Sequence, residues 1–368
     1  MLSGLDDVIA AETVLSDVDG QAGRLIIRGH SLDELVGTAC FEDVVALLWT
    51  DLFPDGPSAE RLGVELGAAR ARLFDRLRVH TAHLAELAPV DFLLACLTRV
   101  PDGNDLTTAL SLLAAPAVLT PAVIRLERGL EPIAPDPTRS QASDVLRMLS
   151  GEIPRIEQVR ALDRYLVTAS DHGLNASTFT ARVIASTHAG LVSAIIGALC
   201  ALKGPLHGGA PGPILDMLDD IGRPERAGPW LEAALARGER LMGFGHRIYR
   251  VRDPRADAVK GALQGLVRGG HVDPERLRLA EAIERAALEV LARHKPGRPL
   301  ETNVEFYTAL LLEALGFSRD AFTCVFAASR AAGWVAHARE QMLHGRLIRP
   351  QSRYVGPPAR EVRLAGSA

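Results

Sequence analysis

The sequence is poor in lysine and has no excess of positive charge. Of its 41 basic residues only Lys203, Lys260 and Lys295 are lysines, and the other 38 are arginines. The net charge of −4 creates no overall field that would attract nucleic acid or an anionic membrane surface. We therefore expect neither nucleic acid nor membrane as a partner, and we expect any anionic ligand to be bound by local groups of arginines.

Cysteines are scarce too, and the sequence has four: Cys40, Cys96, Cys200 and Cys324. They lie far apart without CxxC or metal-ligand spacing, so we expect no metal site and predict buried, reduced thiols in a cytoplasmic protein. The first residues, MLSGLDDVIAAE, contain acids and no basic residue, unlike a signal peptide. The longest apolar run, residues 189–202, is too short to span a bilayer.

Strand signals are confined to one early region. Residues 11–29 have a β-rich segment on each side of an Asp-Gly turn, which predicts a small hairpin. Residues 177–204 are apolar on nearly every face beyond Val183 and predict one helix buried all round. Elsewhere, apolar residues recur every three to four positions and predict helices over 41–53, 58–77, 274–294 and 319–345. The expected fold class is all-α with a small N-terminal β hairpin.

The stretch LMGFGHRIYRVRDPRA, residues 241–256, places two glycines, one histidine and four arginines close together. Gly243 and Gly245 are followed neither by a third glycine in dinucleotide register nor by Gly-Lys-Ser/Thr, so the nucleotide-binding fingerprints are excluded. What remains is a tight turn that places His246 beside arginines suited to carboxylate or phosphate. The alternative is a solvated basic helix start without a ligand.

Two more histidines lie in glycine-rich surroundings. His207 occurs in LKGPLHGGAPGP and His172 occurs in SDHGLNAST. Glycines let a substrate approach the backbone closely, so both histidines are candidates for the same kind of site. His271 and His344 are interpreted as surface residues.

Five segments, GPLHGGA, GFGHRIYRVRDPRA, NVEFYTALLLEALG, SRAAGWVAH and RLIRPQSRYVG, resemble in order and spacing the signature segments of citrate synthase. The stretch AETVLSDVDGQAGRLIIRGHSLDEL resembles the N-terminal segment of the short bacterial and archaeal forms. The resemblance covers nearly the whole chain. It implies a mostly helical homodimer with a large dimerisation domain (1–208 and 317–368) and a mobile, CoA-binding small domain (209–316). Breaks rich in proline and glycine at 208–213, 222–229 and 294–299 fit joints around such a unit.

The resemblance also implies a reaction. Acetyl-CoA would condense with oxaloacetate through an enolate, and hydrolysis of the thioester would release citrate and CoA, with CoA as a co-substrate and no permanently bound cofactor. A thioester methyl group is a very weak acid, so a positioned donor must stabilise the enolate oxygen while a carboxylate removes the proton. The resemblance assigns the donor to His207, the carboxylate to Glu305 and polarisation of the oxaloacetate ketone to His246.

Further residues are implied by the same motifs. The oxaloacetate carboxylates would be bound by His172, Arg255 and Arg330, with Arg349 reaching in from the other subunit. Arg250 is a candidate for the CoA phosphates. The adenine end of CoA would lie at a turn made of Leu241, Met242, Gly243, Phe244 and Gly245.

Position 305 departs from the family pattern, in which the base is usually the aspartate of NVDFY. Glu305 in NVEFY adds one methylene, about 1.5 Å, and misplacement by about 1 Å can cost on the order of 10²-fold in rate. Thr302 to Glu305 also fits the S/T-x-x-E capping box, in which the glutamate bonds back to the Thr302 amide and faces no substrate. The catalytic role of Glu305 is therefore a hypothesis.

Three functions stay open from the sequence. The first is an active citrate synthase, and the second is a 2-methylcitrate synthase that uses propionyl-CoA. An apolar pocket discriminates one methylene by only about 1–3 kcal/mol, so these two are hard to separate. The third is a non-catalytic paralogue that binds CoA or oxaloacetate, which Glu305 favours and the retained histidines and arginines oppose.

Overall fold

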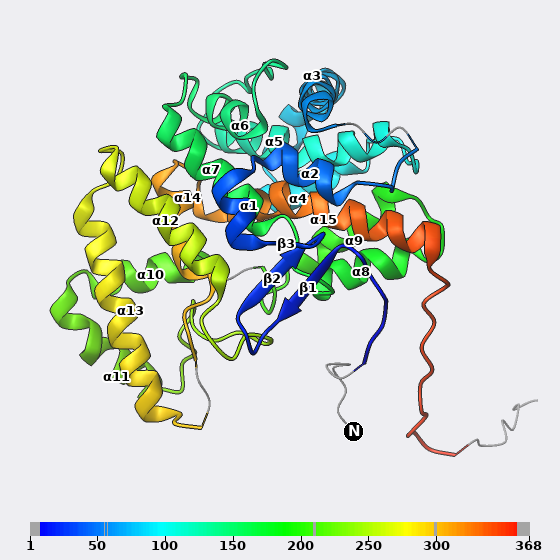
Figure 1. The fold of residues 1–368 in the computed structure, drawn as a ribbon. Coiled ribbons are helices and arrows are strands. Elements are labelled where there is room, and N and C mark those ends of the chain that lie inside the picture. Colours follow the sequence, from blue (N-terminus) through cyan, green and yellow to red (C-terminus); the bar gives the residue numbers. More distant parts are fainter. Residues whose placement is uncertain (1–7, 55, 57, 209–210, 298–299, 359–368) are drawn as a thin grey trace, which may run out of the picture.

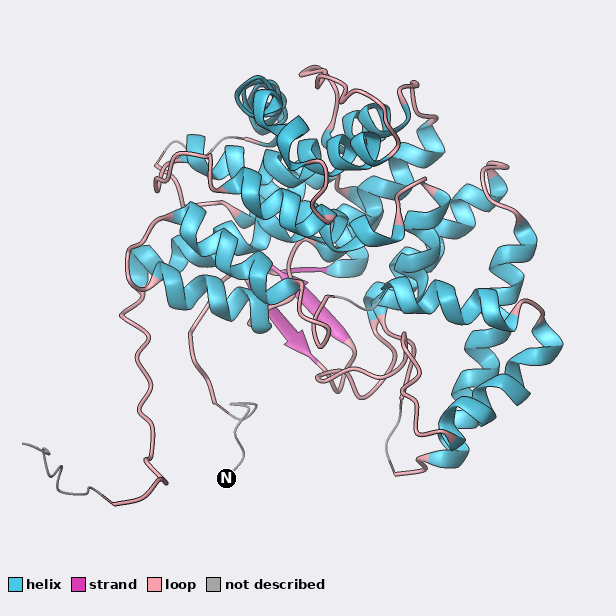
Figure 2. Cartoon of the chain, turned by 180° about the vertical axis from the view of Figure 1, so that it is seen from behind, coloured by secondary structure: helices cyan, strands magenta, loops and turns pink. Residues whose placement is uncertain are grey.

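The computed structural model describes residues 8–54, 56, 58–208, 211–297 and 300–358. Helices make up most of the chain, and the strands form one small sheet on its surface (Figure 1; Figure 2). The expected all-α class with an N-terminal β element is confirmed.

The N-terminal sheet is the hairpin that the sequence predicted over 11–29, with one short strand added. The carboxylate of Asp19 closes its turn by accepting hydrogen bonds from the amides of Gln21 at 3.0 Å and Ala22 at 2.9 Å, as Asp-Gly turns favour. The strands are antiparallel and follow one another in the order β1 (Ser16–Asp19), β2 (Arg24–Ile27) and β3 (His30–Ser31).

A large body of helices surrounds a continuous hydrophobic core. Its last helix packs against the second, fifth, seventh, eighth and ninth helices and is buried along most of its length (Figure 1). In chain order the body consists of α1 (Leu32–Thr38), α2 (Phe41–Leu48), α3 (Ala59–Leu84), α4 (Pro89–Leu97), α5 (Leu106–Glu127), α6 (Gln141–Ser150), α7 (Ile156–Ala169), α8 (Ala176–Ala185), α9 (Leu191–Leu202), the short 3-10 helix η2 (Arg319–Ala321) and α15 (Phe322–His344).

A second group of helices lies to the left of this body in Figure 1. It consists of α10 (Pro211–Ile221), η1 (Pro224–Arg226), α11 (Ala227–Ala236), α12 (Pro254–Arg268), α13 (Pro274–His294) and α14 (Val304–Ala314). Within the group α11 packs on α13, and α14 packs on both α10 and α12. Because α12 also packs against α7, it connects the second group to the large body.

The prediction of one helix over 177–204 is wrong. The chain turns between α8 and α9 at His188 and Gly190, which have φ angles of 60° and 96°. Glycine is required at position 190, since an added Cβ would lie 2.3 Å from the Asp102 carboxylate. The apolar stretch therefore folds into two helices that pack against each other. Helix α2 also ends at Leu48, earlier than the predicted residue 53.

The sequence analysis also missed α5. This helix is long and apolar enough to cross a membrane by length and composition, yet 83% of its apolar window is buried inside the protein. It is therefore a core helix of the large body. The cysteine prediction is only half right: all four thiols are free, and Cys96 and Cys324 are buried, whereas Cys40 and Cys200 are exposed.

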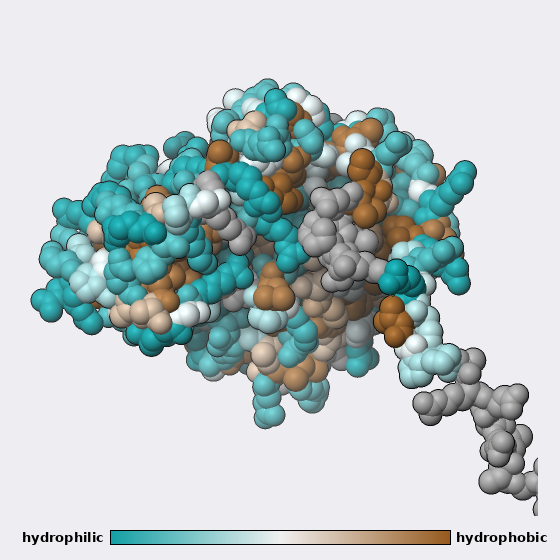
Figure 3. All heavy atoms as spheres, turned by 90° about the horizontal axis from the view of Figure 1, so that it is seen from below, coloured by the Kyte–Doolittle hydropathy of each residue, from teal (hydrophilic) through white to brown (hydrophobic). Residues whose placement is uncertain are grey.

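The underside of the molecule is a mixture of hydrophilic and hydrophobic residues (Figure 3). The part on the left in that view, which belongs to the second group of helices, is mostly hydrophilic. Elsewhere on this face the hydrophobic residues form separate groups. The hydrophobic surface seen from this side is therefore distributed over several small areas.

Candidate active site

Two histidines from different parts of the chain meet at the junction of the helix groups. His172 lies in the turn between α7 and α8, and His246 lies in the segment before α12. Their rings pack edge to face with centroids 5.4 Å apart. Tyr249 fixes the pair, because its hydroxyl lies 3.1 Å from Nε2 of His172 and its ring centroid lies 4.9 Å from that of His246. The stretch 241–256 therefore faces His172 as the site prediction requires.

The backbone determines which nitrogen of His246 carries the proton. Its Nδ1 accepts hydrogen bonds from the amides of Ile248 and Tyr249, both at 3.1 Å. Burial, helped by the positive charge of Arg255, lowers the pKa of His246 to about 4. The ring is therefore neutral near pH 7, and its proton lies on Nε2. That nitrogen is 3.3 Å from Nη2 of Arg255, so two donors face the same space and are suited to share an acceptor oxygen.

His207 is oriented by the first turn of α8. Its Nε2 accepts a hydrogen bond from the amide of Ser177 at 3.3 Å and lies 2.8 Å from the Ser177 hydroxyl. The indole of Trp334 donates to the same hydroxyl at 3.0 Å. Burial lowers the pKa of His207 to about 4, with a further contribution from Arg330. The neutral ring thus carries its proton on Nδ1, which is left as a donor.

Arg330 is a buried cation on α15 with a spare donor. Its Nε donates to the carbonyl of Ala169 at 2.7 Å, and its guanidinium lies 4.8 Å from the centre of the Phe326 ring. Its Nη2 is buried and has no hydrogen-bond partner among the described residues. Burial lowers the pKa of Arg330 to about 10, and the Asp171 carboxylate opposes that shift. A charged, desolvated guanidinium with an unused N–H is suited to bind a carboxylate.

Arg255, the second buried arginine of the candidate site, is bound by a residue whose role the sequence analysis missed. Asp253 accepts hydrogen bonds from Nε of Arg255 at 3.0 Å and from Nη2 at 2.8 Å. The same carboxylate accepts from the amide of Val304 at 3.2 Å. Asp253 therefore links Arg255 to the first turn of α14, the helix that contains Glu305. The Asp-Pro start of α12 was the available signal, because Asp253 is also its N-cap.

The capping-box interpretation of Glu305 is wrong. The N-cap of α14 is Asn303, whose side chain accepts a hydrogen bond from the amide of Glu305 at 3.1 Å. The helix thus begins one residue later than the capping box requires. Among the described residues no hydrogen bond engages the Glu305 carboxyl group. Burial raises the pKa of Glu305 to about 7, opposed by the charges of Arg255 and Arg240, which is near the optimum for a general base.

The turn predicted to receive CoA is joined to the start of α14. The amide of Gly245 donates to the carbonyl of Glu301 at 2.7 Å, and the amide of Asn303 donates to the carbonyl of Gly243 at 3.0 Å. Gly243 has a φ of 87°, and a Cβ there would lie 2.8 Å from the Phe306 ring. Leu241 and Phe244 are buried, whereas Met242 is half-buried. A ligand at this turn would therefore meet mainly backbone.

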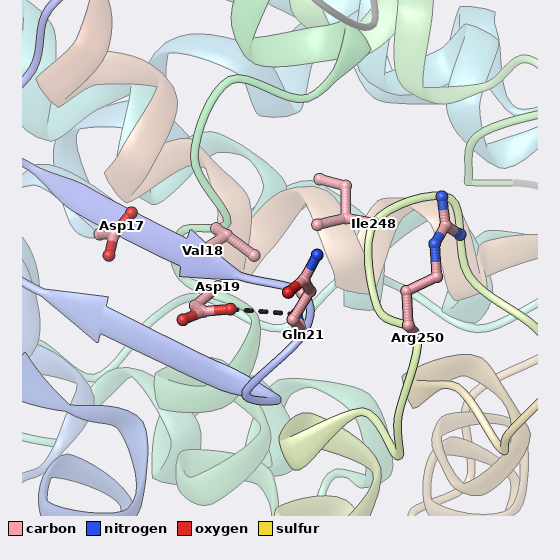
Figure 4. Close-up of a pocket in the computed structure, with 7 residues that line it drawn as sticks. Asp17, Val18, Asp19, Gln21, Ile248 and Arg250 are labelled. Atoms are coloured by element: carbon pink, nitrogen blue, oxygen red, sulfur yellow. Dashed lines mark hydrogen bonds between the residues drawn. The ribbon is translucent and has the colours of Figure 1, made fainter.

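Arg250 lies at an open hollow of about 500 Å³ between the N-terminal hairpin and the segment after His246 (Figure 4). The hairpin contributes Asp17 and Asp19 to the lining, and Ile248 lies beside Arg250. The guanidinium is exposed and reachable, as the predicted phosphate contact requires, but two carboxylates share its surroundings.

Arg349 is not brought to the site within one chain. It is exposed in the segment after α15, which runs away from the helical body (Figure 1). The other predicted histidines and arginines of the oxaloacetate site converge without it. Their convergence is also reflected in His172, whose pKa is well below the ordinary value because of burial and the nearby charges of Arg255 and Arg330.

Tyr165 on α7 is another residue that the sequence analysis did not single out. Its hydroxyl is buried and has no hydrogen-bond partner among the described residues. Burial raises the pKa of Tyr165. The positive charges of Arg330 and Arg255 oppose that rise, and the negative charge of Glu305 adds to it. No group of three His, Cys, Asp or Glu side chains in the described part of the chain is arranged to bind a metal ion.

The sequence matches the family model described as citrate synthase, C-terminal domain, over residues 4–351. The chain belongs to the citrate synthase family. It is 36% identical over 369 residues to the citrate synthase of Haloferax volcanii, covering 96% of this chain and 95% of the relative. It is 34% identical over 370 residues to the 2-methylcitrate synthase of Mycobacterium tuberculosis, covering 96% and 90%.

Solved structures agree with this family membership. Citrate synthase from Thermotoga maritima superposes with a TM-score of 0.85 at 34% identity, covering 98% of this chain and 97% of that one. The enzyme of Thermoplasma acidophilum, in a ternary complex with carboxymethyl coenzyme A and oxaloacetate, gives a TM-score of 0.84 at 28% identity, covering 97% of both chains. The resemblance inferred from the sequence is confirmed, and the family is one of condensing transferases.

Proposed function

We propose that this protein condenses an acyl-CoA with oxaloacetate and hydrolyses the resulting thioester, with acetyl-CoA as the preferred substrate and citrate as the product. The observation that carries the proposal is the convergence of three histidines with depressed pKa values, two buried arginines and Glu305 with its raised pKa. Perturbed groups of complementary roles around one space are typical of an acid–base active site.

Oxaloacetate is the ligand that fits the cationic half of the site. Its two carboxylates would be bound by His172, Arg255 and Arg330, and its ketone would accept a hydrogen bond from Nε2 of His246. Support comes from Nη2 of Arg330, which has no hydrogen-bond partner in the described part of the chain, and from the two donors of His246 and Arg255 that face each other. Arginine suits this role because it stays charged when a ligand and a closing domain remove water.

Acyl-CoA would be activated by Glu305 and His207. The Glu305 carboxylate removes a proton from the methyl group, and Nδ1–H of His207 donates to the thioester carbonyl, whose oxygen becomes the enolate oxygen. The enolate carbon then attacks the ketone of oxaloacetate, and His246 stabilises the alkoxide that forms. A pKa near 7 leaves about half of Glu305 ionised at neutral pH and makes it a stronger base than an ordinary carboxylate.

The CoA portion would lie across the second group of helices. Its adenine would meet the backbone of Leu241 to Gly245, and Arg250 would bind a phosphate. In the proposed division, residues 1–208 and 317–368 form the dimerising domain, and residues 209–316 form a mobile domain that closes on the ligands. Arg349 of a second subunit would complete the oxaloacetate site of a cytoplasmic homodimer.

Two other functions make different predictions. A 2-methylcitrate synthase would prefer propionyl-CoA, and the similarity to the mycobacterial enzyme of that name favours it as the second candidate. A non-catalytic paralogue would bind the ligands without turnover. We would incubate the purified protein with oxaloacetate and each acyl-CoA, measure kcat/KM from the release of CoA thiol, and identify the product by mass spectrometry. Higher kcat/KM with propionyl-CoA would refute the acetyl preference, and no product with either would refute the enzyme.

A further inference from the structure

The N-terminal hairpin (β1, β2 and the turn between them) touches the site at both of its ends. At its first residue, the Ser16 hydroxyl donates a hydrogen bond to Oδ2 of Asp171. Asp171 is fully buried and directly precedes His172. The amide of Gly173 donates to the same oxygen at 3.0 Å. This end of the hairpin therefore contacts the Asp171 carboxylate, which itself accepts a hydrogen bond from the backbone on the other side of His172.

The turn of the hairpin binds the segment between His246 and Arg255. The carbonyl of Gly20 accepts a hydrogen bond from the amide of Arg250 at 2.8 Å. A Cβ on Gly20 would lie only 2.3 Å from the carbonyl oxygen of Ile248. Side chains are thus excluded at the tip because the two backbones approach so closely. Figure 4 shows this tip beside Ile248 and Arg250.

Ser16 and Gly20, at the two ends of strand β1, contact two different segments of the candidate site. His172 belongs to the turn between α7 and α8, whereas His246 and Arg255 flank the segment before α12. Ser16 and Gly20 are four residues apart, which in a strand is about 13 Å. The antiparallel pairing of β1 with β2 keeps that length fixed.

We propose that the N-terminal hairpin is a two-ended brace that sets the distance between His172 and the His246–Arg255 segment, with Ser16 and Gly20 as positioning residues for oxaloacetate. The inference rests on the proposed assignment of the oxaloacetate site. It adds that oxaloacetate binding depends on the hairpin as well as on the residues that contact the ligand. Neither positioning residue touches the ligand: Ser16 acts through the Asp171 carboxylate, and Gly20 acts through the backbone of residues 248–250.

Gly20→Ala tests most directly the contact between the hairpin turn and the backbone of Ile248. Position 20 does not have a left-handed φ, so alanine fits the backbone, and the disturbance comes from the contact with Ile248. Relieving that contact requires a shift of about 1 Å, and a misplacement of that size can cost on the order of 10²-fold. We expect KM for oxaloacetate to rise at least tenfold in protein that circular dichroism shows to be folded. Gly37→Ala is the matched control, since a Cβ there meets nothing within 4 Å, and its kinetics should equal those of the wild type.

Ser16 tests the other end. Ser16→Ala removes the hydrogen bond to Asp171 and should raise KM for oxaloacetate, whereas Ser16→Thr keeps a hydroxyl and should restore it. Independent sites this far apart normally have additive effects. A brace predicts the opposite: the double variant Ser16→Ala/Gly20→Ala should be no worse than the more damaging single variant, because release at either end frees the hairpin.

Oxaloacetate binding by titration calorimetry keeps this test separate from turnover. If the wild type binds oxaloacetate but releases no CoA, the proposed reaction fails while the brace can still be measured as a loss of affinity. Additive effects of the two variants, or wild-type affinity in folded Gly20→Ala protein, would overturn the brace.

Discussion

At the scale of single residues, the site depends on groups whose ordinary protonation the fold has changed. His207 and His246 are neutral donors because backbone amides occupy one nitrogen of each ring and burial lowers their pKa values to about 4. Glu305 is changed in the opposite sense, to a pKa of about 7. Near and above pH 7 the candidate site therefore combines two neutral histidine donors with the ionised carboxylate of Glu305.

The first prediction concerns the pH dependence of kcat/KM for acetyl-CoA. The histidines do not titrate between about pH 5 and 9, so the acid limb reports the ionisation of Glu305. We expect kcat/KM to fall about tenfold per pH unit below a midpoint near 7. Initial rates between pH 5 and 9 measure it, and a midpoint below 5 would show that Glu305 is not the base.

The second prediction links the same carboxyl group to stability. The pKa of Glu305 is higher in the folded protein than its ordinary value of 4.5, so the folded state binds more protons and stability falls as pH rises from 4.5 through 7. Glu305→Gln should avoid this loss. We expect its free energy of unfolding at pH 8 to exceed that of the wild type by about 2–3 kcal/mol, with little difference near pH 4. Urea denaturation at both pH values tests this.

At the scale of elements, the beginnings of α12 and α14 form one unit through Asp253. Its carboxylate binds the Arg255 guanidinium and the amide of Val304, so Arg255 is connected to the helix that contains Glu305, the proposed base. Asp253→Asn keeps the shape but removes the charge of this link. We expect KM for oxaloacetate to rise about tenfold, because a charge-assisted pair is worth about 1.5–3 kcal/mol. Asp257→Asn is a control on an exposed turn of the same helix, and equal effects of both variants would contradict the assignment.

Much of this element structure followed from the sequence, and the failures have physical causes. The hairpin and α13 were predicted because an Asp-Gly turn and a strict helical period are local signals. The break between α8 and α9 was missed because it is imposed by the close approach of Gly190 to Asp102, 88 residues away along the chain. Helix α5 is mostly apolar but was missed, and it contains Pro116 and Pro121, which ordinarily argue against a helix.

The motifs named several of the residues that the structure brings together, but not the residues that orient them. His172, His207, His246 and the two buried arginines converge as the resemblance implied. Asp253, Tyr249 and Ser177 orient those groups, but nothing in the spacing distinguished them from other polar residues. Their roles depend on contacts between segments 30 to 77 residues apart.

At the scale of the whole molecule, the position of Arg349 leads to a complementation test. If each site takes Arg349 from the other subunit, a dimer of one Glu305→Gln chain and one Arg349→Ala chain contains one intact site. The two variants alone should be nearly inactive. After subunit exchange in an equal mixture, half of the dimers are mixed and each has one intact site, so the mixture should recover about a quarter of the wild-type activity. No recovery in a mixture shown to exchange subunits would place Arg349 outside the partner's site.

The central claim is that Glu305 removes a proton from acyl-CoA beside neutral histidines. The most direct measurement is CoA thiol release in a single turnover with acetyl-CoA and oxaloacetate, comparing the wild type with Glu305→Gln at pH 8. The account predicts release by the wild type and a rate lower by about 10²–10⁴-fold in the variant, the typical contribution of general-base catalysis, with oxaloacetate affinity unchanged. Wild-type release by folded Glu305→Gln protein would contradict it.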